Sequence, residues 1–231
     1  MGRDMMKNAE EARMWAPEQY GSRKNHQAID HRLNKTLTFD QFRFQCTPAA
    51  SCSHDAKSCY DRIVHSIANI CMQRCGAPEV PIVCMFTTIQ NLEHHVRTIY
   101  GDSTVSQGGT LWVLPVSGVG QGNGAGPSIW AVVSSPVLDM MRSMGFGAIF
   151  KTAMSGDKIQ FVGYAFVDDK DTVQTGFQGD SIAEVIRKMQ DAIDHWEGGI
   201  RVTGGALVPV KSHWYLVDFK WYRDGTWGYS T

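Results

Sequence analysis

The sequence predicts an α+β fold with an antiparallel sheet. Acidic residues are expected on one face of this sheet, and helices are expected to pack on one face only, the face opposite the acids. Segments 159–166 and 172–173 are rich in β-branched and aromatic residues and flank a short acidic run, which is typical of a β-hairpin. A capping box from Ser181 to Glu184 opens an apolar stripe and predicts a helix. Apolar and aromatic residues between positions 208 and 219 predict further strands.

The acidic run of the hairpin is the first candidate site. An apolar segment that starts at Phe161 ends in the adjacent acids Asp168 and Asp169. Neighbouring carboxylates at the tip of a hydrophobic strand repel each other and lose hydration, and a divalent cation relieves both effects. A polar turn is the alternative explanation of an Asp-Asp pair. The apolar context favours a metal site.

A second acid stands before a helical pattern. Asp55 is followed five residues later by Tyr60, which precedes the pattern. Asp55 is therefore expected at the end of a strand, and Asp61 is interpreted as first-turn charge that the helix dipole favours. The apolar positions that fall on one helix face are Ile63, Val64, Ile67, Ile70 and Cys71.

A glycine-rich segment is the third candidate. Five glycines lie in the ten residues from Gly118 to Pro127, and Gln121 stands among them. Glycine lets the backbone approach a ligand closely, and proline suits the first position of a helix. The segment is interpreted as a substrate-contacting loop that leads into a helix. A flexible linker is the alternative, although it leaves Gln121 unexplained.

Together these segments resemble, in the same order, motifs of the reverse transcriptase palm of the retroelement type. A fourth segment is similar to the glycine-to-lysine motif of that family, and the resemblance covers roughly residues 50 to 220. It implies a right-hand polymerase palm. Gly126 departs from the family pattern, where many members carry Ser, and Phe166 replaces the more frequent Tyr. The four segments are 55–61, 121–127, 166–169 and 204–212.

The resemblance implies a two-metal centre. Asp55 and Asp168 would hold two Mg²⁺ ions, with Mn²⁺ as a substitute, Asp169 would complete the acidic cluster, and the backbone carbonyl of Ala56 would add a ligand. Two such ions, roughly 3.5 to 4 Å apart, stabilise both the attacking and the leaving oxygen of an in-line displacement. Mg²⁺ prefers hard oxygen ligands, which suits this donor set.

The resemblance also implies the substrate contacts. Tyr60 would leave too little room for a 2′-hydroxyl on the incoming nucleotide, although packing at the start of the helix explains it as well. Gln121 and Gly122 would contact the nucleotide or the template strand, and Phe166 would place its ring beside the acids. Lys211 would offer charge or a proton to the pyrophosphate leaving group, although an exposed lysine is usually only solvated.

Composition bounds the domain organisation. With 43% hydrophobic and 19% charged residues, the 231 positions can bury one sizeable core. Residues 1–45 are predicted to be a polar N-terminal extension or a remnant of the fingers, 46–220 a palm-like domain, and 221–231 a C-terminal strand or tail. The formal charge of −1 lacks the basic excess of nucleic-acid binders. The basic partners are therefore expected on the fingers and thumb, which together with nuclease domains would belong to a longer parent polyprotein.

Three further patterns complete the prediction. Residues 82–100 carry apolar residues at helical spacing, with His94 and His95 expected on the outer side. The sequence has no stretch of eighteen apolar residues and no secretory signal, so an intracellular protein without a membrane segment, cytoplasmic or nuclear, is expected. Six cysteines match no familiar zinc spacing and are expected to be buried reduced thiols. They are Cys46, Cys52, Cys59, Cys71, Cys75 and Cys84.

The function that these patterns predict is that of an RNA-directed DNA polymerase from a retrotransposon-like element. It would add deoxynucleoside triphosphates to an RNA or DNA template-primer. Two alternatives stay open: an inactive palm remnant that acts at most as a nucleic-acid-binding module, and an RNA-dependent RNA polymerase palm, against which Tyr60 counts. A glycosyltransferase with an acidic metal-binding turn is a remote third and leaves the Gln121 loop unexplained.

Overall fold

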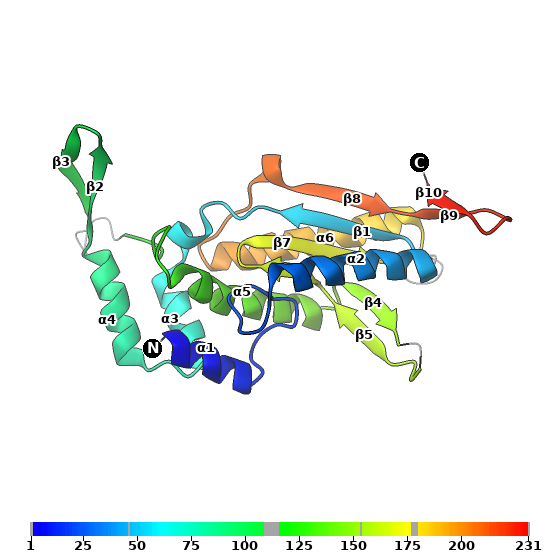
Figure 1. Cartoon of the computed structure of the whole chain (residues 1–231), viewed down its shortest axis with the longest axis horizontal. Coiled ribbons are helices and arrows are strands. Elements are labelled where there is room, and N and C mark those ends of the chain that lie inside the picture. Colours follow the sequence, from blue (N-terminus) through cyan, green and yellow to red (C-terminus); the bar gives the residue numbers. More distant parts are fainter. Residues whose placement is uncertain (1, 46, 109–115, 153, 177–179, 231) are drawn as a thin grey trace.

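The computed structural model describes residues 2–45, 47–108, 116–152, 154–176 and 180–230. Its centre is a four-stranded antiparallel sheet with the strand order β6-β7-β1-β8 (Figure 1). The predicted mixture of helices and antiparallel sheet is confirmed. The four strands are β1 (Ala49–His54), β6 (Gly163–Phe166), β7 (Asp169–Thr175) and β8 (His213–Val217).

Two long helices cover one face of the sheet. They are α5 (Gly126–Ser143) and α6 (Ile182–Val202), and α6 packs on β1 and β7. The Ser181 capping box is present, as predicted, with the side chain of each partner bound to the backbone N–H of the other. Only part of the apolar stripe of α6 is buried, because Val185 and Met189 face the core while Ile182 and Ile186 are exposed.

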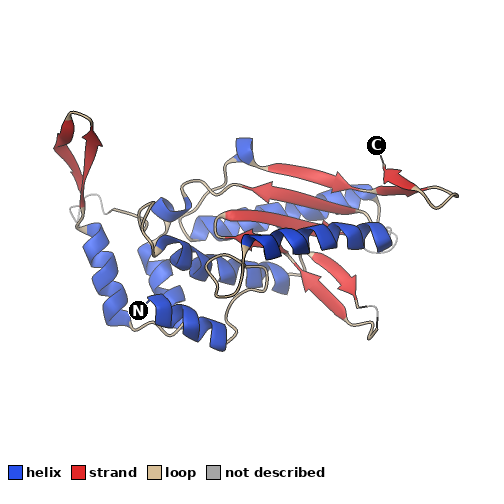
Figure 2. Cartoon of the chain, viewed as in Figure 1, coloured by secondary structure: helices blue, strands red, loops and turns tan. Residues whose placement is uncertain are grey.

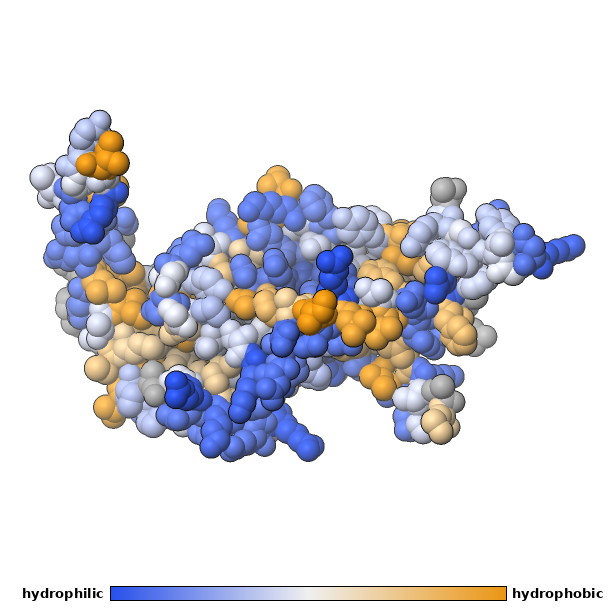
Figure 3. Space-filling view, in the orientation of Figure 1, coloured by the Kyte–Doolittle hydropathy of each residue, from blue (hydrophilic) through white to orange (hydrophobic). Residues whose placement is uncertain are grey.

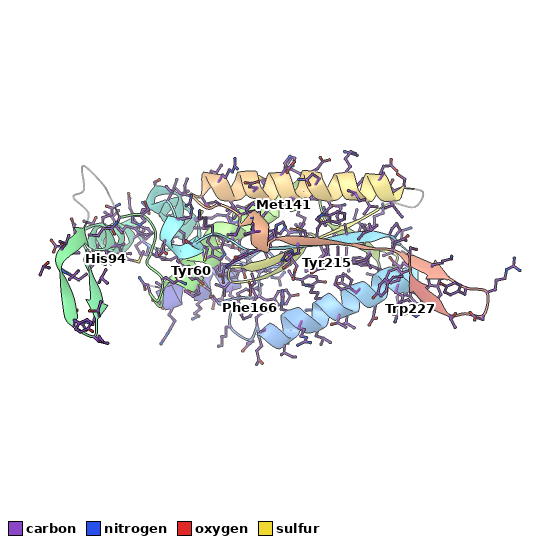
Figure 4. All side chains as sticks on the ribbon, turned by 90° about the horizontal axis from the view of Figure 1, so that it is seen from above. Tyr60, His94, Met141, Phe166, Tyr215 and Trp227 are labelled. Atoms are coloured by element: carbon purple, nitrogen blue, oxygen red, sulfur yellow. The ribbon has the colours of Figure 1, made fainter. Side chains whose placement is uncertain are left out.

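A third helix covers part of the opposite face, so the prediction of helices on one face only was wrong (Figure 4). Alternate residues of a strand point to opposite faces. Ala50 of β1 packs with α6, whereas Ala49 packs in a cluster with Phe42 of helix α2 (Ala28–Gln45). Apolar side chains also gather on the outer surface of α2 (Figure 3), where Leu33 and Leu37 are exposed.

The N-terminal segment forms part of the core. After α1 (Gly2–Glu11), residues 18–21 run beside β6, where the Tyr20 N–H donates to the Ala165 carbonyl at 2.8 Å and the Ala165 N–H donates to the Glu18 carbonyl at 2.9 Å. Glu18 is fully buried and forms an ion pair with Arg142 of α5. A buried carboxylate needs such a partner, which ties this segment to the helix layer.

The helix after Tyr60 starts later than predicted. Residues Cys59–Arg62 form the 3-10 helix η1, and α3 spans His65–Arg74. Ile63 and Val64 are extended between them because the Ile63 carbonyl accepts from Gly118 and the Val64 N–H donates to Thr203. Ile70 is 65% exposed, and Ala68 and Met72 form the buried face instead.

The predicted helix over 82–100 was wrong in its second half. Helix α4 (Glu79–Gln90) ends early, and β2 (Glu93–Thr98) pairs with β3 (Gly101–Gly108) in a projecting hairpin (Figure 1). Gly101 turns the chain with a positive φ of 114°, and Arg97 forms an ion pair with Asp102 across the turn. Local β-branched residues and this turn outweighed the helical spacing.

The cysteine prediction holds in part. Cys52, Cys59 and Cys75 are buried free thiols and Cys71 is half-buried, whereas Cys84 is exposed, which contradicts the prediction for that residue. Cys46 lies outside the described residues. Burial raises the pKa of Cys52 to about 11, so its thiol stays protonated near neutral pH.

Two small hairpins and a short helix complete the structure (Figure 2). The elements are β4 (Ala148–Lys151) with β5 (Lys158–Phe161), the 3-10 helix η2 (Pro209–Lys211), and β9 (Phe219–Trp221) with β10 (Trp227–Tyr229). The predicted strand over 159–166 is split at Val162 into β5 and β6.

No helix in the described part of the chain is long and apolar enough to cross a bilayer.

Candidate catalytic site

Residues from four separate segments of the chain meet at one end of the sheet, the first of which, residues 55–61, runs from the end of β1 into η1. They line a cavity of about 360 Å³ that lies between the end of β1, the β6–β7 turn, η1, the glycine-rich loop and η2. Of the residues singled out from the sequence, Asp169, Gly122 and Phe166 do not line it. Those that do are Asp55, Ala56, Tyr60, Gln121, Asp168 and Lys211.

The acidic turn connects β6 to β7. Phe166 pairs with Asp169, which leaves Val167 and Asp168 as the two residues of the turn. Asp168 is half-buried at the cavity, whereas Asp169 is exposed at the start of β7. Phe166 lies at the same end of the sheet as Tyr60 (Figure 4) but packs toward the α2 side, close to His31.

Electrostatic repulsion acts on Asp169 from the acids around it, which lie in the β6–β7 turn, on β7 and after β1. Partial burial raises the pKa of the Asp169 carboxyl, and the charges of Asp168, Asp171 and Asp55 raise it further, while His31 lowers it. The ionised form of Asp169 is therefore disfavoured by its neighbours. Within the described residues, no three His, Cys, Asp or Glu side chains converge closely enough to hold a metal ion.

Lys211 lies next to Asp55. Its ammonium Nζ is 3.0 Å from Asp55 Oδ2, and its side chain is 68% exposed. The pairing follows from the backbone, because the Val208 N–H donates to the Asp55 carbonyl at 2.9 Å and Ala56 bridges to Leu207. The segment after α6 is thus fastened to the end of β1, and the lysine neutralises one of the acids.

The ring of Tyr60 lies against the glycine-rich loop. A Cβ on Gly126 would stand 3.3 Å from Tyr60 Cδ1, so glycine at this position leaves room for the ring. Burial and then the nearby Asp168 raise the pKa of the Tyr60 hydroxyl to about 12. It is therefore protonated at neutral pH and can donate a hydrogen bond.

Asp61 has a role that local spacing did not indicate. Its carboxylate Oδ1 accepts from the backbone N–H of Gln121 at 3.0 Å. Gly118 approaches so closely that a Cβ would lie 2.4 Å from Asp61 Cα. Asp61 therefore fixes the glycine-rich loop beside η1. The interpretation as first-turn charge missed this contact because its partner is sixty residues away.

Cys59 is another cavity residue without a sequence signal. Burial raises the pKa of its thiol to about 12, and the charge of Asp168 acts in the same direction. The thiol is thus kept protonated beside the Asp168 carboxylate. Its spacing from the other cysteines carried no information about this contact.

Comparison with known proteins places the fold. No protein-family model and no curated protein matches the sequence. The structure is similar to that of telomerase from Candida tropicalis truncated from its C-terminal domain, with a TM-score of 0.59 and 13% identity over 93% of this chain and 39% of that chain.

Two further solved structures give the same result. Telomerase from Candida tropicalis in complex with a TWJ fragment of telomeric RNA has a TM-score of 0.60 at 12% identity, over 93% of this chain and 33% of that chain. The corresponding Candida albicans complex has a TM-score of 0.55 at 12% identity, over 93% and 34%. This chain thus spans a third or slightly more of the length of these structures. It has a reverse-transcriptase-like fold, and the matches do not support the predicted retrotransposon origin.

Proposed function

We propose that this chain is an RNA-directed DNA polymerase palm that adds deoxynucleotides to a primer end by two-metal phosphoryl transfer. The observation that carries the proposal is the cavity in which four segments of a reverse-transcriptase-like fold bring together Asp55, Tyr60, Gln121, Asp168 and Lys211.

The donors are of the chemical type that Mg²⁺ binds, although within the described residues no three acidic side chains converge on one point. Carboxylate oxygens of Asp55, Asp168 and Asp169 and the carbonyl of Ala56 are hard ligands of the kind that Mg²⁺ prefers. Burial and then the charges of neighbouring acids raise the pKa of Asp169, and a divalent cation would relieve the repulsion between these charges. When bound, two such ions supply stabilisation of charge on the attacking and leaving oxygens.

The remaining cavity residues would orient the substrate. Tyr60 presents a protonated hydroxyl and a flat ring beside the acids, which would restrict the space at the sugar 2′ position. The Gln121 side chain would donate to a nucleotide or template base. Lys211 would leave Asp55 and bring its positive charge to the pyrophosphate.

A template-primer is the proposed macromolecular partner. Two of the similar telomerase structures are complexes with a fragment of telomeric RNA, which supports a nucleic-acid partner for this fold. The acidic residues of the cavity and the net charge of −1 would by themselves repel the phosphates of a nucleic acid. Binding would therefore depend on cations at the site and on basic surfaces of other domains.

One specific observation favours a second candidate, a palm that binds nucleic acid without catalysis. Lys211 forms an ion pair with Asp55, one of the carboxylates that would hold a metal. If the ion pair persists in the presence of Mg²⁺ and substrate, Lys211 continues to neutralise Asp55, and Asp55 cannot bind a metal ion. The polymerase proposal requires that the metal displaces the lysine.

Metal-dependent primer extension separates the two candidates. The purified chain and Asp55→Asn are compared with Asp157→Asn, an exposed acid in the β4–β5 turn. We expect Mg²⁺-dependent extension with deoxynucleotides that Asp55→Asn lowers by at least about a hundredfold and that Asp157→Asn leaves unchanged. Template binding without extension by the folded chain would instead support the non-catalytic palm.

A further inference from the structure

The β6–β7 turn contains a backbone conformation that its own side chain disfavours. Val167, directly before Asp168, has a φ of 60°, in the left-handed region. A β-branched residue is a genuine outlier there, because its Cβ crowds the backbone. Such strain persists only where the surroundings impose it. Whatever holds Val167 therefore also determines where Asp168 points.

Two buried side chains from outside the hairpin bind both backbone polar groups of Val167. The Val167 N–H donates to Gln19 Oε1 at 3.3 Å, and the indole Nε1–H of Trp130 donates to the Val167 carbonyl at 2.7 Å. Gln19 is fully buried and Trp130 is 2% exposed. Gln19 belongs to the segment beside β6, and Trp130 to the first turns of α5.

The amide of Gln19 is itself held in one orientation. Its Nε2 donates to Ser134 Oγ of α5 at 3.2 Å, while its Oε1 also accepts from the Gly21 N–H at 3.0 Å. Gly21 packs directly on the turn, since a Cβ there would lie 2.2 Å from the Val167 nitrogen. The acceptor oxygen is thus fixed toward Val167 by bonds at both ends of the amide.

We propose that Gln19 and Trp130 are positioning residues that hold Val167 in its left-handed conformation and thereby fix the orientation of Asp168 and Asp169. Neither side chain lines the cavity, so they act through the backbone of the turn. The consequence for catalysis rests on the proposed polymerase function. The clamp itself, by which we mean the hydrogen bonds of Gln19 and Trp130 to Val167, does not depend on that function.

Amide hydrogen exchange of the full chain, followed by NMR, tests the clamp. Gln19→Met and Trp130→Phe each remove one hydrogen bond to Val167, and Ser134→Ala removes the bond at the other end of the same amide. We expect exchange over residues 166–169 to rise about tenfold in the first two variants and to rise less in Ser134→Ala, because the Gly21 N–H still holds the Gln19 oxygen in place.

The Val167 N–H is the most informative probe, because Trp130→Phe removes no bond to it. Faster exchange there in Trp130→Phe therefore reports movement of the whole turn. Unchanged exchange over 166–169 in both Gln19→Met and Trp130→Phe would overturn the proposal. An equal rise throughout β1 and β7 would overturn it as well, because that result indicates general loosening of the sheet.

Val167→Gly supplies a second test that does not depend on the clamp variants folding well. Glycine adopts a positive φ without strain, so the turn should need less external support. We expect Gln19→Met to lower kcat for primer extension about tenfold with KM for the deoxynucleotide within about twofold, and to lower it much less in the Val167→Gly background. Equal losses in both backgrounds would contradict a positioning role.

The outcomes separate this inference from the proposed function. If the wild-type chain extends no primer but shows the expected exchange pattern, the polymerase proposal fails and the clamp stands. If it extends primers and neither variant changes exchange or kcat, the clamp fails and the polymerase proposal stands.

Discussion

At the scale of single residues, the site combines groups whose charge is disfavoured with groups that neutralise them. The Asp169 carboxyl is repelled by three other acids, whereas Asp55 is paired with Lys211. Around them, burial keeps the Tyr60 hydroxyl and the Cys59 thiol protonated. The cavity therefore contains hydrogen-bond donors beside carboxylates.

Tyr60→Ala tests the proposed sugar selection. Removing the ring opens space beside Asp168, so we expect discrimination between deoxynucleotides and ribonucleotides to fall about tenfold or more. The measurement is kcat/KM for both nucleotide types. Tyr100→Ala, at a site 94% exposed in the β2–β3 turn, is the matched control. Unchanged discrimination in Tyr60→Ala would remove the assigned role and reopen the RNA polymerase alternative.

His65 links stability to pH. Its Nε2–H donates to the Gly118 carbonyl, its Nδ1 faces the Gln90 amide at 2.9 Å, and its ring stacks on Phe86. Burial lowers the pKa of His65, although the bond to Gly118 opposes this. The folded state thus binds this proton less readily than the unfolded state, whose pKa is about 6.5. The contribution is complete above that pH and is lost as the pH falls below it.

His65→Gln should therefore flatten the dependence of the unfolding free energy on pH below about pH 6.5. Urea denaturation at a series of pH values measures this slope. His94→Gln, in the exposed strand β2, should keep the wild-type slope. The same slope in His65→Gln and the wild-type protein would show that another group is responsible.

At the scale of elements, the sheet depends on close approaches that only glycine permits. A Cβ on Gly163, at the start of β6, would lie 2.0 Å from the Asp171 carbonyl oxygen of β7. The Gly163 Cα and the Asp171 oxygen both belong to the backbones of paired strands, so neither can move without breaking the hydrogen bonds between β6 and β7. By contrast, a Cβ on Gly198 in α6 would meet nothing within 4 Å.

Alanine at these two glycines should have opposite effects. We expect Gly163→Ala to lower the unfolding free energy by more than about 2 kcal/mol, and Gly198→Ala to raise it by up to about 1 kcal/mol. Chemical denaturation of both variants measures the difference. A Gly163→Ala variant as stable as the wild type would mean that β6 and β7 do not pair in this register.

Sequence patterns predicted the elements where local signals agreed with the tertiary structure. The capping box at Ser181 defines the start of α6, and Pro127 lies in the first turn of α5. The sequence patterns failed where contacts between residues far apart in the chain determined the secondary structure. Ile63 is held extended by Gly118 rather than helical, and the turn at Gly101 converts the end of a helical pattern into a hairpin.

At the scale of the whole molecule, the cavity residues that were predicted from sequence share one property. Asp55, Tyr60, Gln121, Asp168 and Lys211 stand at or near the ends of regular elements, where side chains from several segments meet. Their order along the chain was readable without a structure, and their chemical roles stay predictions.

The supporting contacts were not readable in this way. Gln19 reaches Val167 across 148 positions, and Asp61 reaches Gln121 across 60. A buried glutamine in a polar segment has no periodic signal, because its partners lie on elements that only the folded chain brings together. The support of the acidic turn could be found only from the structure.

Primer extension with Mg²⁺ on matched RNA and DNA templates tests the central claim most directly. The purified chain is compared with the Asp168→Asn, Asp169→Asn double variant, with equal folding checked by circular dichroism. We expect extension with deoxynucleotides on the RNA template, and its loss in the double variant. Equal extension by both proteins, or none by the folded wild-type chain, would contradict the claim that this acidic turn is the centre of a working polymerase.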